Sequence, residues 1–478
     1  MRDVPSLFGR GWFPEAGPSR GSIPGGDRGE DRVRSFKIDV YGCQMNAYDG
    51  DRLRTALSGA GWTEVQGEDE ADAVLFVTCS IRDKAEQKVA SELGRYRPGG
   101  GRKAPVVALL GCMAQRLGED IPRRFPWVRL LAGPRHLGRV PEALGRCLED
   151  DQLRVFLDED PRALEDLRFP PQVTPGSIRA YVTIAHGCDH FCAYCIVPYV
   201  RGRFQSRDPE AILREVRCLA DRGVREITLL GQNVNRFGVD RSDGFSFPRL
   251  LREVAEVPGV LRVRYATSHP VDFSEELVRV MAEHPRVCPA LNLPVQSGSD
   301  RILAAMGRGY DGASYRRSVG LLRERVPDAG LTTDLIVGFP GETEEDFRES
   351  LSLLEELRFD QVHSAAYSVR PGTRAESLPG HLDQATRMRR LGEVNDLQSR
   401  IAREINETYV GRVLPVLAEG PAPKGEGFWQ GRTPQDKVVL FPGPATAGEE
   451  ILVRIVSAET WYLRGEVQRP GEERPWIS

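Results

Sequence analysis

Short apolar runs alternate with amphipathic stretches along the first third of the chain. Four such runs precede residue 150: FKIDVY (36–41), AVLFVT (73–78), PVVALL (105–110) and VRLLAG (128–133). Runs of this length, separated by segments with helical periodicity, are typical of a parallel sheet with helices on its faces. The pattern therefore predicts an α/β domain over residues 35–150.

A second series of the same kind begins after a charged, proline-rich stretch that we interpret as a linker, residues 151–178. Its apolar runs are YVTIA (181–185), EITLL (226–230), LRVRYA (261–266), PALNLP (289–294), LTTDLIV (331–337) and DQVHSAA (360–366). The first helix is well signalled, with Asp208 as N-cap, Pro209 in the first turn and Gly223 as terminator. Six units are too few for a closed eight-stranded barrel, so we predict a partial (β/α)6 barrel over residues 179–405.

The pattern of apolar runs changes again near the C-terminus. Residues 406–470 hold five short strand-like runs separated by glycine and proline turns, which predicts a small antiparallel barrel. Residues 1–34 contain seven glycines and four prolines without a sustained period, and we expect a disordered tail there and a short tail at 471–478. The predicted fold class is α/β with a C-terminal β-barrel.

Composition limits the function more than the fold. The 478 residues carry a net charge of -4, and no apolar run approaches the ~20 residues needed to span a bilayer. We therefore expect a cytoplasmic protein without a membrane partner, in which any RNA contact is a local patch. The nine cysteines favour reduced thiols and metal over disulfides.

Three thiols fall within eight residues directly after the first strand of the barrel. Cys188, Cys192 and Cys195 form a CxxxCxxC pattern that supplies three metal ligands and no obvious fourth. Structural zinc sites usually close a tetrahedron with paired ligands, so a metal centre with one open position is the natural interpretation. The alternative is a zinc knuckle whose fourth ligand is His186 or His190.

Three more cysteines follow strands of the N-terminal domain. Cys43, Cys79 and Cys112 each stand at the end of a predicted strand, where the loops of a parallel sheet leave from one edge. The position predicts that these thiols converge on a second metal site, although any one of them could simply be a small buried side chain. The remaining cysteines lie in ordinary apolar or amphipathic settings and are assigned to core packing: Cys147, Cys218 and Cys288.

Several barrel strands end in small, neutral, polar segments: LLGQNVN (229–235), TSHP (267–270), PVQSGS (294–299) and DLIVGFPGE (334–342). Such segments let a ligand approach the backbone and offer uncharged hydrogen bonds. Collected on one rim, they suit a zwitterionic, nucleoside-like ligand.

The CxxxCxxC loop resembles the signature of the radical S-adenosylmethionine (SAM) enzymes. YGCQMNAYDG (41–50), TCSIRDKAEQKV (78–89) and LLGCMAQR (109–116) are similar to the N-terminal domain of the methylthiotransferases within that superfamily, and the C-terminal barrel resembles the TRAM domain, an RNA-binding module. The resemblance implies two 4Fe-4S clusters, one held by each cysteine triplet, and SAM as methyl donor and radical source. It also implies that the SAM pocket is lined by Tyr194, Gly231, Gln232, Ser268, Gln296 and Ser297.

Within this family YGCQMN resembles the branch that adds a methylthio group to carbon 2 of N6-dimethylallyladenosine at position 37 of tRNA. Other branches act on threonylcarbamoyl-adenosine of tRNA or on a ribosomal-protein aspartate, and these remain alternatives. A non-catalytic metal-containing RNA-binding protein is the alternative of another class. The expected partners are the tRNA anticodon loop, an external electron donor and a supplier of sulfur or cluster repair, and we expect a monomer.

Basic residues provide candidate RNA contacts at two places. Arg201, Arg203 and Arg207 follow the cysteine loop, where they could grip a phosphate backbone or form a solvated basic loop. The candidates in the C-terminal barrel are Trp429, Arg432 and Lys437.

Overall fold

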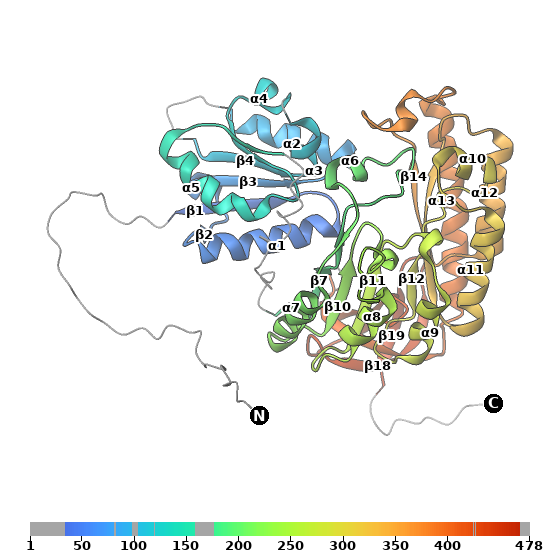
Figure 1. The fold of residues 1–478 in the computed structure, drawn as a ribbon. Coiled ribbons are helices and arrows are strands. Elements are labelled where there is room, and N and C mark those ends of the chain that lie inside the picture. Colours follow the sequence, from blue (N-terminus) through green and yellow to red (C-terminus); the bar gives the residue numbers. More distant parts are fainter. Residues whose placement is uncertain are drawn as a thin grey trace, which may run out of the picture. The chain divides into compact units, whose positions relative to one another are not determined.

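The structure is a computed structural model that describes residues 34–80, 83–97, 104–118, 120–157, 176–423, 425 and 427–468 (Figure 1). The described residues form one compact unit by their internal contacts. Both predicted tails lie outside the described residues, apart from Arg34, and so does most of the predicted linker.

A six-stranded, all-parallel sheet forms the N-terminal domain, in the order β2-β1-β3-β4-β5-β6. Its strands are β1 (Ser35–Val40), β2 (Thr63–Glu64), β3 (Ala73–Thr78), β4 (Val106–Gly111), β5 (Val128–Ala132) and β6 (Arg154–Phe156). The direction of winding reverses between β1 and β3, which is where open α/β sheets bind ligands. β6 belongs to the sheet, so the domain extends past the predicted boundary at 150; its three residues are too few to show a strand period.

Helices cover both faces of this sheet (Figure 1). On one face α1 (Gln44–Gly59) and α5 (Val140–Asp150) pack on the strands, and the other face is covered by α2 (Asp83–Arg95), α3 (Cys112–Leu117) and α4 (Asp120–Arg124). The buried strands β3 and β4 have no exposed position, which explains their uninterrupted apolar sequences.

The second domain is the predicted partial barrel of six parallel strands. One sheet has the order β7-β10-β11 and the other β12-β13-β14. A parallel β-bridge between Val263 in β11 and Val287, shortly before β12, connects the two sheets. Their bounds are β7 (Arg179–Thr183), β10 (Glu226–Leu230), β11 (Arg262–Ala266), β12 (Ala290–Asn292), β13 (Gly330–Val337) and β14 (Gln361–Ala366). A two-stranded ribbon, β8 (Ala185–His186) with β9 (Gln205–Ser206), brackets the cysteine loop.

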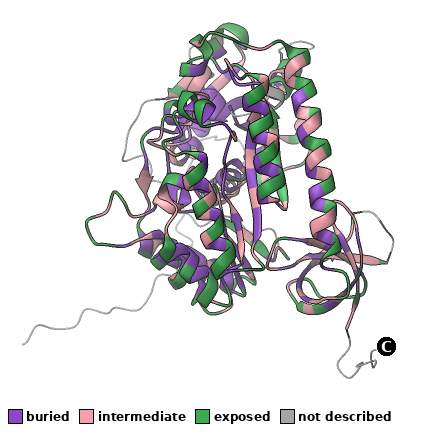
Figure 2. Ribbon diagram, turned by 90° about the vertical axis from the view of Figure 1, so that its right-hand side faces the viewer, coloured by how far each residue is buried: buried purple, intermediate pink, exposed green. Residues whose placement is uncertain are grey.

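Helices pack around this barrel, with their buried residues facing the strands and their exposed residues outward (Figure 2). Their bounds are α7 (Pro209–Asp221), α8 (Phe247–Ala255), α9 (Glu275–Glu283), α10 (Asp300–Met306), α11 (Gly312–Arg325) and α12 (Glu344–Leu357). The short helix α6 (Val197–Arg201) packs instead against Cys112 of the N-terminal domain. The predicted cap of α7 is present, because the Asp208 side chain accepts a hydrogen bond from Ala211 N at 3.0 Å.

The long helix α13 (Gln384–Glu407) leads into the C-terminal barrel. The barrel is closed in the order β15-β16-β17-β19-β18, with strands β15 (Val413–Pro421), β16 (Phe428–Arg432), β17 (Val438–Pro442), β18 (Glu450–Ala458) and β19 (Leu463–Val467). The five strands confirm the prediction, except that β17 and β19 pair in parallel and the barrel is therefore not wholly antiparallel. That pairing closes the barrel between strands that are not consecutive, which strand-by-strand periodicity cannot reveal.

Candidate functional site

The first thiol group lies in the loop between β8 and α6, at the carboxyl end of the barrel strands. Cys188 N donates to the Gly202 carbonyl at 3.1 Å, and Cys195 N donates to the Cys192 carbonyl at 2.9 Å. Gly187 opens the loop with φ 72°, and a Cβ there would lie 2.0 Å from the Arg203 carbonyl oxygen, so only glycine fits. Phe191, beside Cys192, is held at φ 45°, which is strained for an aromatic residue.

The spacing of these thiols argues against a zinc knuckle. A tetrahedral site with Zn–S bonds of about 2.3 Å brings its sulfur atoms to about 3.8 Å of one another. Among the described His, Cys, Asp and Glu residues, one trio has its ligand atoms all within 4.8 Å, and that trio contains no cysteine. The thiolates of a multi-iron cluster bind different corners and do not need to approach so closely.

The structure brings Cys43, Cys79 and Cys112 together, as their strand-end positions predict. Gly42 packs so closely that a Cβ on it would lie 2.2 Å from Cys79 Cβ and 3.1 Å from Cys79 Sγ. Cys43 is the N-cap of α1, and Cys112 begins α3. The adjacent parallel strands β1, β3 and β4 thus deliver three distant thiols to one edge of the sheet.

The pKa values of the thiols differ, and the difference does not follow the division into two groups. The hydrogen bond with Cys79 lowers the pKa of Cys43 to about 5, and Arg201 assists against the opposing effect of burial. Burial raises the pKa of Cys112, and it raises the pKa of Cys195 to about 12. A metal ligand must be a thiolate, so the buried cysteines need positive charge nearby.

Two buried arginines supply that charge. Arg201 Nε donates to Cys112 Sγ at 3.3 Å, and Arg308 Nη1 donates to Cys192 Sγ at 3.3 Å. Their exposed fractions are 3% and 4%. Arg308 was not identified from the sequence. It lies between Gly307 and Gly309, and two glycines so close together were a sequence signal of an unusual turn; both have positive φ in the structure.

The segment after Cys195 joins the two thiol groups. Ile196 and Val200 are buried against Cys112, and Arg201 at the end of the same short helix binds it. The edge that carries the second triplet therefore adjoins the loop that carries the first.

The rim of the barrel carries polar atoms that lack a partner. Gln232 Oε1, Ser268 Oγ and Gln296 Oε1 are buried and make no hydrogen bond in the structure. They follow β10, β11 and β12 respectively, and Gln296 has φ 73°. Buried polar atoms of native proteins are normally paired, so these three atoms indicate a polar ligand at this rim.

The other residues predicted for this pocket are differently placed. Ser297 is fully buried, and its hydroxyl lies 3.5 Å from Ser350 Oγ and accepts from Ser299 N. Gly231 is buried directly after β10. Tyr194 receives a hydrogen bond from Arg308 at 3.2 Å, and the same guanidinium contacts Cys192.

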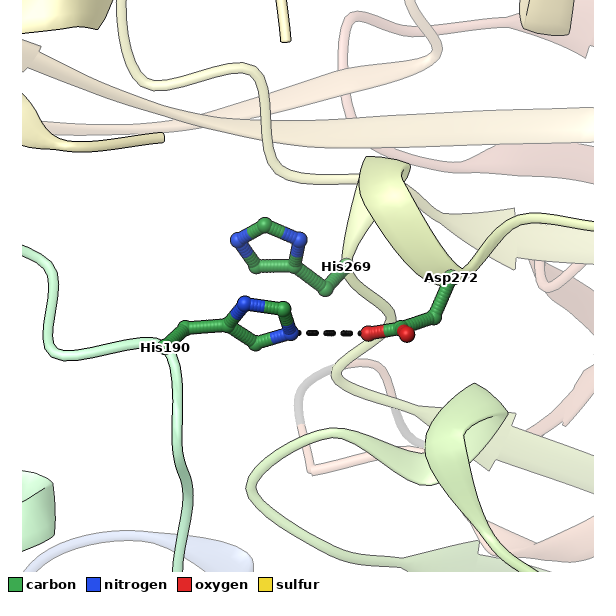
Figure 3. A group of neighbouring side chains, drawn as sticks. All are labelled: His190, His269 and Asp272. Carbon is green, nitrogen blue, oxygen red and sulfur yellow. Dashed lines mark hydrogen bonds and ion pairs between the residues drawn. The ribbon is translucent and has the colours of Figure 1, made fainter. Parts of the chain in front are cut away.

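His190, His269 and Asp272 form the one trio close enough for a single ion, but their orientation opposes this role (Figure 3). The two imidazoles stack at 3.8 Å and 6°, so the lone pairs in their ring planes run parallel and do not converge. His190 Nε2 is instead paired with Asp272 Oδ2 at 2.7 Å. The trio anchors the cysteine loop to the end of β11.

Three residues predicted to contact RNA are committed to internal partners. Arg201 is buried, as described above, and Lys437 Nζ is buried between Asp360 at 2.6 Å and Asn406 at 2.8 Å. Arg207, with a side chain 15% exposed, binds Glu215 at 2.7 Å and Tyr48 at 3.0 Å. In this structure internal partners neutralise the charges of these three residues, so we do not propose them as RNA contacts.

Comparison with known proteins places these features in a class. Residues 182–354 match the Radical SAM superfamily, residues 35–133 match the uncharacterized protein family UPF0004, and residues 407–468 match the TRAM domain. The fold is also similar to TsrM from Kitasatospora setae, a radical S-adenosylmethionine methyltransferase, with 16% identity, a TM-score of 0.44 and coverage of 72% of this chain and 74% of that chain. The matches to the family models, and not this structural likeness, place the barrel in the Radical SAM superfamily and a separate cysteine-bearing domain before it.

Curated relatives define the family more narrowly. The tRNA-2-methylthio-N(6)-dimethylallyladenosine synthase of Moorella thermoacetica is 43% identical over 91% of this chain and 98% of its own length. That of Nitratidesulfovibrio vulgaris strain DP4 is 46% identical with the same two coverages. The chain belongs to the tRNA-2-methylthio-N(6)-dimethylallyladenosine synthase family.

Proposed function

We propose that this chain adds a methylthio group to carbon 2 of N6-dimethylallyladenosine at position 37 of tRNA. The observation that carries the proposal is the presence of two separate cysteine triplets joined by residues 196–201. When bound, the cluster at the barrel loop and SAM supply radical chemistry, and the second cluster supplies the sulfur.

The residues of the chain have distinct tasks in this proposal. Cys188, Cys192 and Cys195 would hold the first cluster, and Cys43, Cys79 and Cys112 the second. Gln232, Ser268 and Gln296 would orient SAM through their unpaired oxygen atoms, and Tyr194, Gly231 and Ser297 stay predictions for the same pocket. The His190–Asp272 pair would fix the cluster loop, so that the reacting groups are held in position.

Removal of the Ser268 hydroxyl tests the SAM pocket. Because Ser268 Oγ has no partner in the structure, Ser268→Ala should leave the fold intact and remove one hydrogen bond to SAM, worth about 0.5–1.5 kcal/mol. We expect the Kd for SAM to rise by about 2- to 13-fold in equilibrium binding to the anaerobic holoenzyme. Ser318→Ala on α11 is the control, and equal affinity in both variants would exclude Ser268 from the pocket.

An exposed aromatic pair beside the cysteine loop is suited to RNA. Phe191 and Tyr199 are 38% and 49% exposed and meet edge to face at 6.0 Å. Arg203, whose side chain is 70% exposed, lies 5.4 Å from the Phe191 ring and pairs with Asp189. Bases of single-stranded loops stack on such surfaces, and the anticodon loop offers bases that are already unpaired.

Loss of the Tyr199 ring should weaken tRNA binding. Stacking of one base contributes about 1–3 kcal/mol, so Tyr199→Ala should raise the Kd for tRNA by about 5- to 150-fold. Tyr199 is preferable to Phe191 because it does not lie between cluster ligands. Met388→Ala, which removes a side chain of similar exposure on α13, is the control in a filter-binding titration, and equal Kd values for the two variants would refute the contact.

The C-terminal barrel offers weaker candidates. Arg432 pairs with Asp436 at 3.0 Å and Glu419 at 3.2 Å, and Trp429 is half-buried against the barrel core. Both stay predictions for RNA contact. Trp461, 53% exposed between β18 and β19, is a further candidate that the sequence analysis did not name.

Other partners follow from the chemistry. We propose an external electron donor, a supplier of sulfur or cluster repair, and a monomeric enzyme in the cytoplasm, where tRNA is found. Among the described helices, none combines the length and the hydropathy required to cross a bilayer.

Anaerobic reconstitution followed by reaction with defined tRNAs tests the proposed function. We expect about eight irons per chain and methylthiolation of tRNA that carries N6-dimethylallyladenosine. Reaction with threonylcarbamoyl-adenosine or with a ribosomal protein instead would assign the chain to another branch. Bound zinc without SAM cleavage would support a non-catalytic RNA-binding protein.

A further inference from the structure

Arg201 extends from the loop of the first cluster to the ligands of the second. It ends α6, six residues after Cys195, and its guanidinium is buried in the N-terminal domain. Nε donates to Cys112 Sγ at 3.3 Å, and Nη2 donates to Asn46 Oδ1 and to Asp49 Oδ2, each at 3.1 Å. Both Asn46 and Asp49 lie in the first turns of α1, which begins after Cys43.

One nitrogen of the buried Arg201 guanidinium lacks an acceptor. Burial of a guanidinium is costly unless it is paired and hydrogen-bonded. Asp49, 1% exposed, supplies one carboxylate at 3.1 Å, which pairs with Nη2 of Arg201. Arg201 Nη1 makes no hydrogen bond. A site with three thiolates and a cluster is net negative, so it would provide an acceptor for this donor.

Arg308 shows the same arrangement at the other triplet. Its Nη1 donates to Cys192 Sγ at 3.3 Å, and the remaining nitrogens bind Tyr310 and the Pro294 carbonyl. Each thiol group therefore has one buried guanidinium that donates to one cysteine. Arg201 differs because it belongs to the segment that carries the opposite group.

We propose that Arg201 is the positioning residue of the second cluster: it donates to the Cys112 thiolate, raises the reduction potential of that cluster, and ties it to the loop of the first. Hydrogen bonds to ligand sulfur and nearby positive charge favour the more negative, reduced form of a cluster, which raises its potential. The inference rests on the proposed function, because it requires a cluster at Cys43, Cys79 and Cys112.

A redox titration followed by electron paramagnetic resonance tests this role in the reconstituted full chain. We expect Arg201→Gln to shift the midpoint potential of the second cluster to more negative values and to leave that of the first unchanged. Arg201→Lys, which keeps the charge, should recover part of the shift. Arg308→Gln should shift the midpoint potential of the first cluster to more negative values and leave that of the second unchanged.

Arg207→Gln is the matched control. Arg207 is also held between the two domains, by Tyr48 and Glu215, but neither partner is a cysteine, so its loss should move neither potential. An unchanged second potential in Arg201→Gln would overturn the proposal, as would equal loss of iron from Arg201→Gln and Arg207→Gln. Loss of the second set of irons from Arg201→Gln alone would support it. A wild-type chain that takes up only about four irons would instead refute the proposed function.

Discussion

Cys192→Ala should abolish cleavage of SAM. Cys192 is one of the three thiols of the β8–α6 loop, and it is the thiol that Arg308 contacts. Loss of a group that merely supports a metal ligand costs about 10- to 100-fold, so loss of a ligand should lower the rate by at least about 100-fold. The measurement is 5′-deoxyadenosine formed per chain under dithionite, by chromatography.

Cys218→Ala provides the control for that experiment. Cys218 is half-buried on α7, among the cysteines assigned to packing, and its replacement should leave SAM cleavage unchanged. Retention of wild-type cleavage by Cys192→Ala would mean that the loop does not hold the radical-generating cluster.

Cys79→Ala should separate SAM cleavage from sulfur insertion. Cys79 stands at the end of β3 and contacts Cys43, so its loss should empty the second site while the barrel loop keeps its own three thiols. We expect continued formation of 5′-deoxyadenosine, a decrease of iron from about eight to about four per chain, and no methylthiolated tRNA. Mass spectrometry of the digested tRNA provides the readout.

The control for this second experiment is Cys147→Ala. Cys147 is a buried cysteine of the same domain, but it lies on α5 and approaches the Arg129 and Gln152 carbonyls. The Cys147→Ala variant should retain both SAM cleavage and methylthiolation of tRNA, although its stability should be lower. If the Cys79 variant still produced methylthiolated tRNA, the second triplet would not be the source of the inserted sulfur.

The positions of the barrel strands and of both cysteine triplets could be predicted from the sequence. EITLL coincides with β10 and AVLFVT with β3. Strands that are buried on both faces consist mainly of apolar residues, so they can be recognised in the sequence. Adjacency of Cys43, Cys79 and Cys112 followed from one rule, that the loops of parallel strands leave from one edge.

Electrostatic pairing over long sequence separations could not be predicted. Arg201 appeared to belong to a basic loop, but Asp49 and Cys112, 152 and 89 residues away, neutralise it inside the fold. Lys437 is paired with Asp360 in the same way. The short strands β2 and β6 were missed because two or three residues are too few to establish a period.

The nucleosides of tRNA from a strain that lacks this chain test the central claim most directly. By mass spectrometry, 2-methylthio-N6-dimethylallyladenosine should disappear and N6-dimethylallyladenosine should accumulate, and the wild-type chain should reverse both changes while Cys79→Ala reverses neither. An unchanged level of the methylthio nucleoside in the deletion strain, or its restoration by the Cys79 variant, would contradict the assignment of the two cysteine triplets.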